Sequence, residues 1–215
     1  MKKTKSIFPP VDSADRDGLL AVSRDVNAEM LFDAYTHGIF PWPSDENFIL
    51  WFAPPTRFIL RFEDLHIPSR LARALRKKDF EFRVDTSFPE VIQASSEQPR
   101  PRQDGTWITP KMIVAYEEFH RLGFAHSFET FNREGRLVGG LYGVLIGKYF
   151  SGESMFYRES GASKFALLNT VSWLRERGLG WLDAQAETPH IAQFGGRNME
   201  RPAFMLLIKD ALQSH

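Results

Sequence analysis

The chain has 215 residues, 43% of them hydrophobic and 13% aromatic, which is typical of a globular protein with one large core or one core and a small annex. Lysine plus arginine and aspartate plus glutamate number 27 each, so any nucleic-acid partner must be held by a local patch and not by a global field. The sequence has no cysteine, which excludes disulfides, zinc ribbons and a cysteine nucleophile and is compatible with a reducing cytoplasm.

Histidine spacing and hydropathy exclude two further classes. The six histidines never form a two-histidine helical spacing with a nearby acid, so no metal site is predicted. No apolar run is long enough for a signal peptide or a transmembrane helix. We therefore expect a soluble, cytoplasmic protein.

The N-terminal part is aromatic and irregular. Residues 6–24 are predicted to be an extended lead-in, and Asn27 is predicted to cap a short helix that ends at Gly38. A strand over residues 48–52 follows, and the prolines at 54 and 55 end it. The helix is expected to bury Leu31, Ala34 and Tyr35.

From this pattern we predict a small aromatic-rich N-terminal domain at residues 1–57 and a larger domain at residues 58–215. Tyr35, Trp42 and Trp51 are available at the junction. They either pack the two parts together or line a pocket, and packing is the simpler interpretation for any one of them.

A basic helix is predicted after a strand at residues 58–62. Ser69 opens the helix, whose Leu71 and Leu75 fall on one face. Basic side chains fall on the opposite face and just beyond its end; we call them the basic helix face, which consists of Arg70, Arg73, Arg76, Lys77 and Lys78. Such a face is most often simply solvated, but it is the densest positive patch of the chain and our candidate for phosphate contact.

The middle of the chain alternates short elements. A strand at 80–84, a helix at 88–94 and a loop at 95–104 are predicted. Thr109 then caps a helix that begins at Pro110 and ends at Gly123, followed by a strand at 125–131. The buried stripe of this helix is expected to be Met112, Ala115, Tyr116 and Phe119.

Two glycine-rich strands, at residues 137–144 and 149–156, form the centre of the predicted sheet. Their glycines remove side chains where another backbone or a ligand must come close. A single carboxylate, Glu153, stands among aromatic and thioether groups. It is either the exposed end of a buried hairpin or a charge kept for chemistry.

The C-terminal part begins with the longest helix, which Ser160 or Ser163 is expected to cap and Gly178 to end. A strand at 181–185 then delivers Asp183 and Gln185 to one face. A last strand is predicted at 204–208. Antiparallel strands followed by helix, strand, loop and strand predict the α+β class with a mixed sheet, and two carboxylates and an amide near aromatic walls suit a site that receives an amine.

Two short motifs point elsewhere but do not fit. Residues 175–180 match the R-x-x-G-x-G pattern that holds pyrophosphate in acetyl-coenzyme A transferases, but anion binding needs the start of a helix and these glycines follow a helix end. Residues 152–156 lack the second glycine of a nucleophile elbow, so a serine hydrolase is weakly supported. No Walker loop or dinucleotide fingerprint is present.

Several longer segments, taken in chain order, match one family. They are residues 18–21, 35, 38–42, 105–109, 125–127, 129, 137–143, 152–156 and 162–164, and Asp183, Gln185 and His190. Through these segments the chain resembles the leucyl/phenylalanyl-tRNA-protein transferases. Many motifs in the right order form a more specific signal than any one of them.

The resemblance implies a small N-terminal domain and a C-terminal domain of the GCN5-related acyltransferase fold. It implies an enzyme that moves Leu or Phe, sometimes Met, from its tRNA to the N-terminal amine of a protein beginning with Arg or Lys, which marks that protein for degradation. The substrates then need no cofactor, because an aminoacyl ester is already activated. We expect the chain to act as a monomer.

The resemblance also assigns residues. Asp183 and Gln185 match the family's catalytic pair, and the basic helix face matches the tRNA-contacting region. Positions around the aminoacyl-adenosine and the acceptor are matched by Tyr35, Trp42, Trp107, Tyr116, Phe150 and Glu153, with Ser154 beside Glu153.

The chain departs from the family pattern at Ser23, Arg24, Ala184, Thr188 and Gln193. Thr188 follows the catalytic pair closely, so acceptor choice is the inference that it affects most. Two other functions stay open: an acyl-coenzyme A-dependent N-acetyltransferase and a non-catalytic tRNA-binding module.

Overall fold

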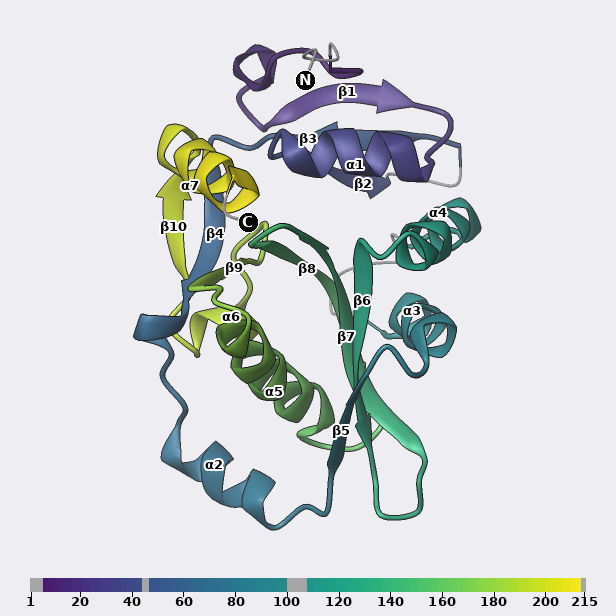
Figure 1. The fold of residues 1–215 in the computed structure, drawn as a ribbon, viewed down its shortest axis with the longest axis vertical. Coiled ribbons are helices and arrows are strands. Elements are labelled where there is room, and N and C mark those ends of the chain that lie inside the picture. Colours follow the sequence, from purple (N-terminus) through teal and green to yellow (C-terminus); the bar gives the residue numbers. More distant parts are fainter. Residues whose placement is uncertain (1–5, 44–46, 100–107, 214–215) are drawn as a thin grey trace.

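The computed structural model describes residues 6–43, 47–99 and 108–213 (Figure 1). Two sheets organise these residues: a three-stranded sheet of order β1-β3-β2 and a seven-stranded sheet of order β10-β4-β9-β8-β7-β6-β5. The small sheet lies at one end of the molecule, above the large sheet in the view of Figure 1. The predicted arrangement of a small N-terminal region and a mixed sheet with helices is confirmed.

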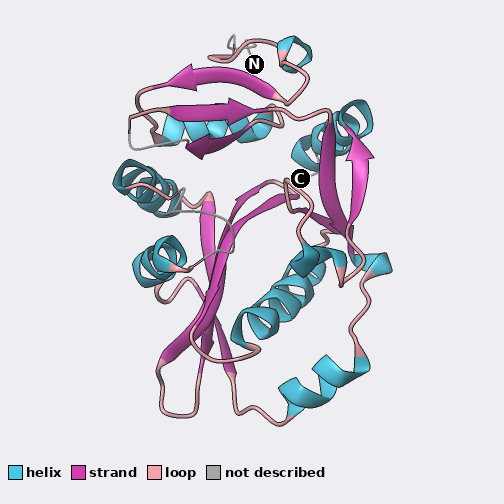
Figure 2. Ribbon diagram, turned by 180° about the vertical axis from the view of Figure 1, so that it is seen from behind, coloured by secondary structure: helices cyan, strands magenta, loops and turns pink. Residues whose placement is uncertain are grey.

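The small sheet is formed by the N-terminal residues. A 3-10 helix, η1 (Val11–Ser13), precedes β1 (Leu19–Ser23), α1 (Ala28–Thr36), β2 (Phe40–Pro43) and β3 (Ile49–Phe52). The side chain of Asn27 accepts a hydrogen bond from the backbone N–H of Met30, as a helix N-cap does. β1 and β2 both run antiparallel to β3, and α1 covers one face of the sheet, as Figures 1 and 2 show from opposite sides. The lead-in is therefore more structured than predicted, because its end pairs with β3.

The large sheet contains one parallel pair of neighbours. Its strands are β4 (Thr56–Arg61), β5 (Glu81–Val84), β6 (Ala125–Phe131), β7 (Leu137–Ile146), β8 (Tyr149–Tyr157), β9 (Trp181–Asp183) and β10 (Arg197–Glu200). All neighbouring strands pair antiparallel except β8 and β9, which pair through Ser151 and Asp183. The two parallel strands, which α5 (Ala162–Glu176) connects, therefore meet at a polar position.

Helices cover both faces of the large sheet. They are α2 (Ser69–Arg76), α3 (Phe88–Glu97), α4 (Pro110–Arg121), α5 (Ala162–Glu176), α6 (Pro189–Ala192) and α7 (Arg201–Gln213), with a 3-10 turn η2 (Phe62–Asp64). In Figure 1, α3 and α4 lie on one side of β6 and β7, and α5 lies on the other. Within the described residues, no helix has the length and apolar character needed to cross a bilayer.

Close approach explains two of the glycines in the central strands. A Cβ added at Gly139 would lie 2.5 Å from the Cβ of Ala162, so this glycine lets the start of α5 pack directly on β7. At Gly143 an added Cβ would lie 2.4 Å from the backbone oxygen of Ser151 on β8. The prediction that these glycines admit neighbouring backbone is confirmed.

Several local predictions are confirmed and three are wrong. The strand predicted at 181–185 ends at Asp183, because Gln185 has φ of +61° and lies in a turn. The Thr109 side chain caps α4 by accepting from the N–H of Met112, and the predicted stripe of α4 is buried. The strand predicted at 204–208 is wrong: these residues lie in α7, where Phe204, Ile208 and Ala211 form a helical stripe, and the last strand is β10. The predicted N-cap of α5 is also wrong.

Neither predicted serine caps α5. Its N-cap is Gly161, with φ of +90° and no side-chain hydrogen bond. At the other end, α5 stops at Glu176 and Gly178 has φ of +78°. The glycines of the R-x-x-G-x-G segment therefore follow a helix end, as predicted, and cannot offer the free N–H groups of a helix start.

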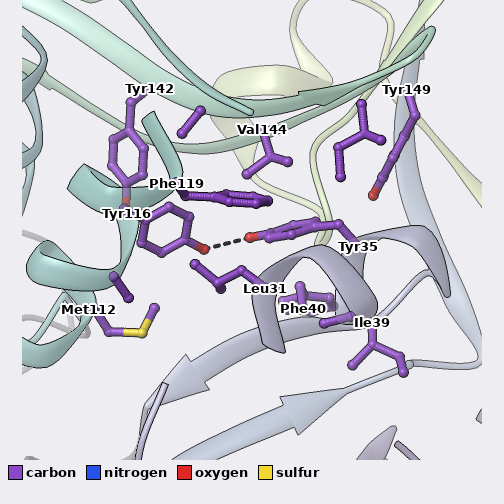
Figure 3. Close-up of a cluster of buried hydrophobic side chains, with 14 of the residues drawn as sticks. Leu31, Tyr35, Ile39, Phe40, Met112, Tyr116, Phe119, Tyr142, Val144 and Tyr149 are labelled. Atoms are coloured by element: carbon purple, nitrogen blue, oxygen red, sulfur yellow. Dashed lines mark hydrogen bonds between the residues drawn. The ribbon is translucent and has the colours of Figure 1, made fainter. Parts of the chain in front are cut away.

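One apolar core joins the two sheets. It includes Leu31 and Tyr35 from α1, Phe119 from α4, Tyr149 from β8 and Phe204 from α7. Figure 3 shows the aromatic part of this core. A second core lies between the large sheet and α5. The division into domains at residues 57 and 58 stays a prediction.

Candidate active site

A buried polar cluster forms where β8 and β9 run side by side. Ser151 and Glu153 both lie on β8, and the Ser151 hydroxyl donates a hydrogen bond to the Glu153 carboxylate, so the two side chains meet. Asp183 ends β9 directly opposite Ser151, and Gln185 follows two residues later. We call these four residues the carboxylate–amide cluster. The structure thus brings together the carboxylates and the amide that the sequence analysis singled out.

Asp183 is a buried carboxylate that forms an ion pair and two further hydrogen bonds. It is completely buried, and the Arg57 guanidinium contacts it through Nε at 3.0 Å and Nη2 at 2.8 Å. The Tyr149 hydroxyl donates to its Oδ2 at 2.7 Å, and the backbone N–H of Gln185 donates to its Oδ1 at 2.7 Å. Paired and hydrogen-bonded in this way, the carboxylate can stay charged away from water.

Glu153 has no such cation. It is 9% exposed, and the described residues form no ion pair with it. Its Oε1 accepts from Ser151 Oγ at 2.9 Å and from Gln185 Nε2 at 2.8 Å, and its Oε2 accepts from the Tyr116 hydroxyl at 3.2 Å. Burial raises the pKa of the Glu153 carboxyl to about 7, although the hydrogen bonds from Gln185, Tyr35 and Ser151 oppose the rise.

Two tyrosines extend the hydrogen-bonded chain away from Glu153. The hydroxyls of Tyr116 on α4 and Tyr35 on α1 lie 2.5 Å apart, as the dashed line in Figure 3 marks. Burial raises the pKa of both phenols well above the usual value, and the neighbouring Glu153 adds to the rise. Both hydroxyls therefore stay protonated, and the small N-terminal region contacts the cluster through them.

Gln185 lies in a strained turn. Its φ is +61°, and the N–H of Ala186 donates to the carbonyl of Ala184 at 2.7 Å, which is the bond of a classic γ-turn centred on Gln185. A non-glycine residue in this region is held there by its surroundings and is common at functional sites. The side-chain Nε2 donates to both Glu153 and Ser151, so the amide oxygen is the end left for another partner.

The other predicted substrate residues lie at different places. Trp42 is 37% exposed on β2. Phe150 is buried in the second core, on the other face of β8. Ser154 is half-buried next to Glu153 and pairs with Tyr142, because the register between β7 and β8 shifts at Glu153. Trp107 lies outside the described residues.

The basic helix face is exposed as predicted. All five of its side chains are exposed, whereas Leu71 and Leu75 are half-buried. In Figure 1, α2 lies at the end of the molecule away from the small sheet. The structure therefore separates the basic helix face from the small N-terminal region.

Sequence reasoning missed Arg57, Tyr149 and Ser151. Ser151 carried a signal, because a hydroxyl two residues before Glu153 on a strand is expected to share its face. Arg57 carried none, since its partner Asp183 is 126 residues away. Only the structure identifies it.

The overall fold is similar to one solved structure, "Crystal structure of FemX". The TM-score is 0.51 at 11% sequence identity, and the match covers 86% of this chain and 73% of that one. At this identity the likeness shows the fold alone.

Sequence comparison is more specific. Residues 59–209 match the sequence model of the family described as "Leucyl/phenylalanyl-tRNA protein transferase", and residues 24–55 match that of its N-terminal domain. A relative named leucyl/phenylalanyl-tRNA–protein transferase from Maridesulfovibrio salexigens is 45% identical over 207 residues, which cover 96% of this chain and 86% of the relative. One of the same name from Xanthomonas oryzae pv. oryzae is 48% identical over 200 residues, covering 92% and 80%.

Relatives this similar over most of both chains place the protein among the aminoacyltransferases. More narrowly, the chain belongs to the leucyl/phenylalanyl-tRNA protein transferase family. The family predicted from the sequence motifs is confirmed.

Proposed function

We propose that the protein transfers Leu or Phe, and also Met, from aminoacyl-tRNA to the N-terminal α-amine of proteins that begin with Arg or Lys. The observation that carries this proposal is Glu153 in a chain of this family. Its buried carboxylate contacts the Gln185 amide and pairs with no cation in the part of the chain that the structure describes. Such a carboxylate attracts an ammonium group. Transfer would mark the acceptor protein for degradation by the N-degron pathway.

The reaction is an aminolysis of an ester. The α-amine of the acceptor attacks the aminoacyl carbonyl, a C–N bond forms, and the bond from that carbonyl to the ribose oxygen breaks. The amine loses one proton, and the ribose oxygen leaves with one. Since an α-amine has a pKa of about 8, a mild proton acceptor and correct positioning are sufficient at neutral pH.

The roles of the cluster follow from its contacts. Gln185 is proposed to engage the attacking amine through its amide oxygen, because its Nε2 is held by Glu153 and Ser151. Asp183 orients Gln185 through the backbone N–H. Glu153 helps to hold the amino groups of the substrates.

Aromatic residues are proposed to form the pocket for the aminoacyl-adenosine. Tyr35 and Tyr116 contribute through the hydroxyl pair next to Glu153. The proposed pocket also includes Trp42, Trp107 and Ser154, and Phe150 is proposed to support it from the other face of β8, in the second core. An apolar wall of this kind suits the side chains of Leu and Phe.

The tRNA is proposed to contact the basic helix face, whose exposed cations suit phosphate groups. The large sheet is proposed to have the GCN5-related acyltransferase fold, which the parallel β8–β9 pair beside the cluster supports. We propose a boundary between a small domain at 1–57 and a catalytic domain at 58–215, and a monomer that works in the cytoplasm without a cofactor.

The test is transfer of labelled Leu from charged tRNA to matched peptides that begin with Arg, Lys, Asp or Ala. Transfer to Arg and Lys peptides alone supports the proposal. Transfer to the Asp peptide would instead assign a different acceptor class, and no transfer to any peptide would favour a tRNA-binding module. A coenzyme A titration checks the acetyltransferase alternative, which predicts saturable binding.

Two variants connect the activity with the cluster. Gln185→Ala is expected to lower the turnover by on the order of 100-fold, because the amine loses its positioning partner. Gln93→Ala is the matched control, since Gln93 is an exposed glutamine on α3 that contacts only Glu97 through its amide. Equal turnover in the two folded variants would refute the role of Gln185.

A further inference from the structure

Arg57 is the least expected residue near the cluster. It is a charged side chain that is only 1% exposed at the start of a strand. Its guanidinium lies between the rings of Phe40 and Phe204, with Cζ 4.4 Å and 4.6 Å from the ring centroids. Nη1 donates to the carbonyl of Gly38 at 3.0 Å. All of these contacts fix where the positive charge lies.

The orientation of this guanidinium fixes the position of the Asp183 carboxylate. Nε and Nη2 face the carboxylate, and the fork geometry satisfies both of its oxygens. Burial opposes the charge on Arg57, but the attraction of Asp183 outweighs it and raises the pKa of the guanidinium. Arg57 therefore stays charged and forms a buried ion pair with Asp183.

The Asp183 carboxylate, held in place by Arg57, holds the turn at Gln185. Its Oδ1 accepts the Gln185 N–H at 2.7 Å while Oδ2 accepts from Tyr149. The γ-turn at Gln185 is unfavourable by itself, so it needs this external acceptor. This turn directs the Gln185 side chain to Glu153, where Nε2 donates to Oε1 at 2.8 Å.

We propose that Arg57 is a positioning residue for the transfer reaction, acting through Asp183 on the strained turn that presents Gln185 to the acceptor amine. This inference rests on the proposed function. Because Gly38 and Phe40 belong to the N-terminal region and Phe204 to the last helix, the small sheet and α7 together set the geometry of the reacting amide.

The alternative is that Arg57 serves only the packing of the core. The two views differ in the transfer rate of a variant that lacks only the Arg57 guanidinium. If Arg57 acts through Asp183, removing both has the same effect on turnover as removing Asp183's charge alone. If Arg57 only packs, its removal changes stability and leaves turnover per folded molecule unchanged.

The experiment compares Arg57→Met, Asp183→Asn and the double variant. Each is measured by thermal unfolding and by single-turnover transfer of labelled Leu to an Arg peptide, at saturating charged tRNA. We expect a loss in transfer rate on the order of 100-fold in each folded variant, with the double variant no worse than Asp183→Asn. The matched control is Arg83→Met, which removes the exposed ion pair between Arg83 and Glu81 and should keep the full transfer rate.

If Arg57→Met does not fold, Arg57→Lys takes its place, because lysine keeps the positive charge but lacks the planar fork that contacts both Asp183 oxygens, and the same loss in rate is expected. The double variant leaves no unpaired buried charge and reports the loss through Asp183. A folded double variant with the full rate, or a folded Arg57→Met with the full rate, would overturn the proposal. Multiplicative losses in the double variant would also overturn it, since they indicate independent roles. Failure of the wild-type protein to transfer to any peptide would instead overturn the proposed function.

Discussion

Replacing Glu153 by glutamine tests the electrostatics of the site in isolation. Glutamine keeps the shape of the side chain and one acceptor oxygen but cannot ionise. The wild-type carboxyl has a pKa of about 7 in the folded protein, whereas an unperturbed glutamate titrates at 4.5. At about 1.4 kcal/mol per pKa unit, burying the charged form costs about 3 kcal/mol.

The sign of the pH dependence follows from proton binding. Between pH 4.5 and about 7 the folded protein holds a proton on Glu153 that the unfolded chain has released. The free energy of unfolding therefore falls as the pH rises through this window. Below it neither state is charged, and above it the full cost is present.

We expect Glu153→Gln to gain stability relative to the wild type as the pH rises, by about 2 to 3 kcal/mol between pH 5 and pH 8. The assay is urea unfolding of both proteins at several pH values, read as the difference between them, so that other titrating groups cancel. Glu134→Gln, at an exposed carboxylate of the turn before β7, should show a constant difference. A constant difference for Glu153→Gln as well would refute the raised pKa.

Three further predictions concern packing, hydrogen bonding and tRNA contact. Tyr116→Phe removes a buried hydroxyl that contacts both Tyr35 and Glu153, and it should lower the free energy of unfolding in urea by about 1 to 3 kcal/mol. The same substitution at the exposed Tyr157 should change the free energy of unfolding by almost nothing. Gly139→Ala should lower the free energy of unfolding by about 1 to 3 kcal/mol, because the new Cβ would overlap the start of α5. Gly180→Ala should leave it unchanged, because a Cβ at Gly180 would have no atom within 4 Å. Replacing the basic helix face by glutamines should weaken tRNA binding and flatten its dependence on salt by roughly one unit of slope per lost phosphate contact, measured by titration at 50 to 200 mM salt; an unchanged slope would exclude α2 from the tRNA interface.

Local sequence signals predicted the elements whose reasons are local. The caps at Asn27 and Thr109 and the stripe of α4 need only neighbouring residues, and the structure confirms them. The segment 204–208 failed because a short apolar run fits a strand or a helix equally well without knowledge of its surroundings. It packs against Tyr149 and Trp181, which the chain brings close only after folding.

The candidate site was predictable only as far as its signals are local in the sequence. Glu153 was noticeable as a carboxylate in an apolar strand, and Asp183 and Gln185 as polar residues two apart. Their meeting depends on β9 lying beside β8, which no spacing determines. The ion pair of Arg57 with Asp183 depends on a contact across 126 residues, and so no local pattern could indicate it.

The separation in sequence of these contacts has a consequence for folding. Tyr35 and Tyr116 are 81 residues apart, and Arg57 and Asp183 are 126 apart, so each half of the site closes a long loop. Closing a long loop costs conformational entropy, and this cost is smallest when most of the intervening chain is already folded. The cluster should therefore form in the last stage of folding, and a nascent chain that still lacks β9 has no site that could act on an aminoacyl ester.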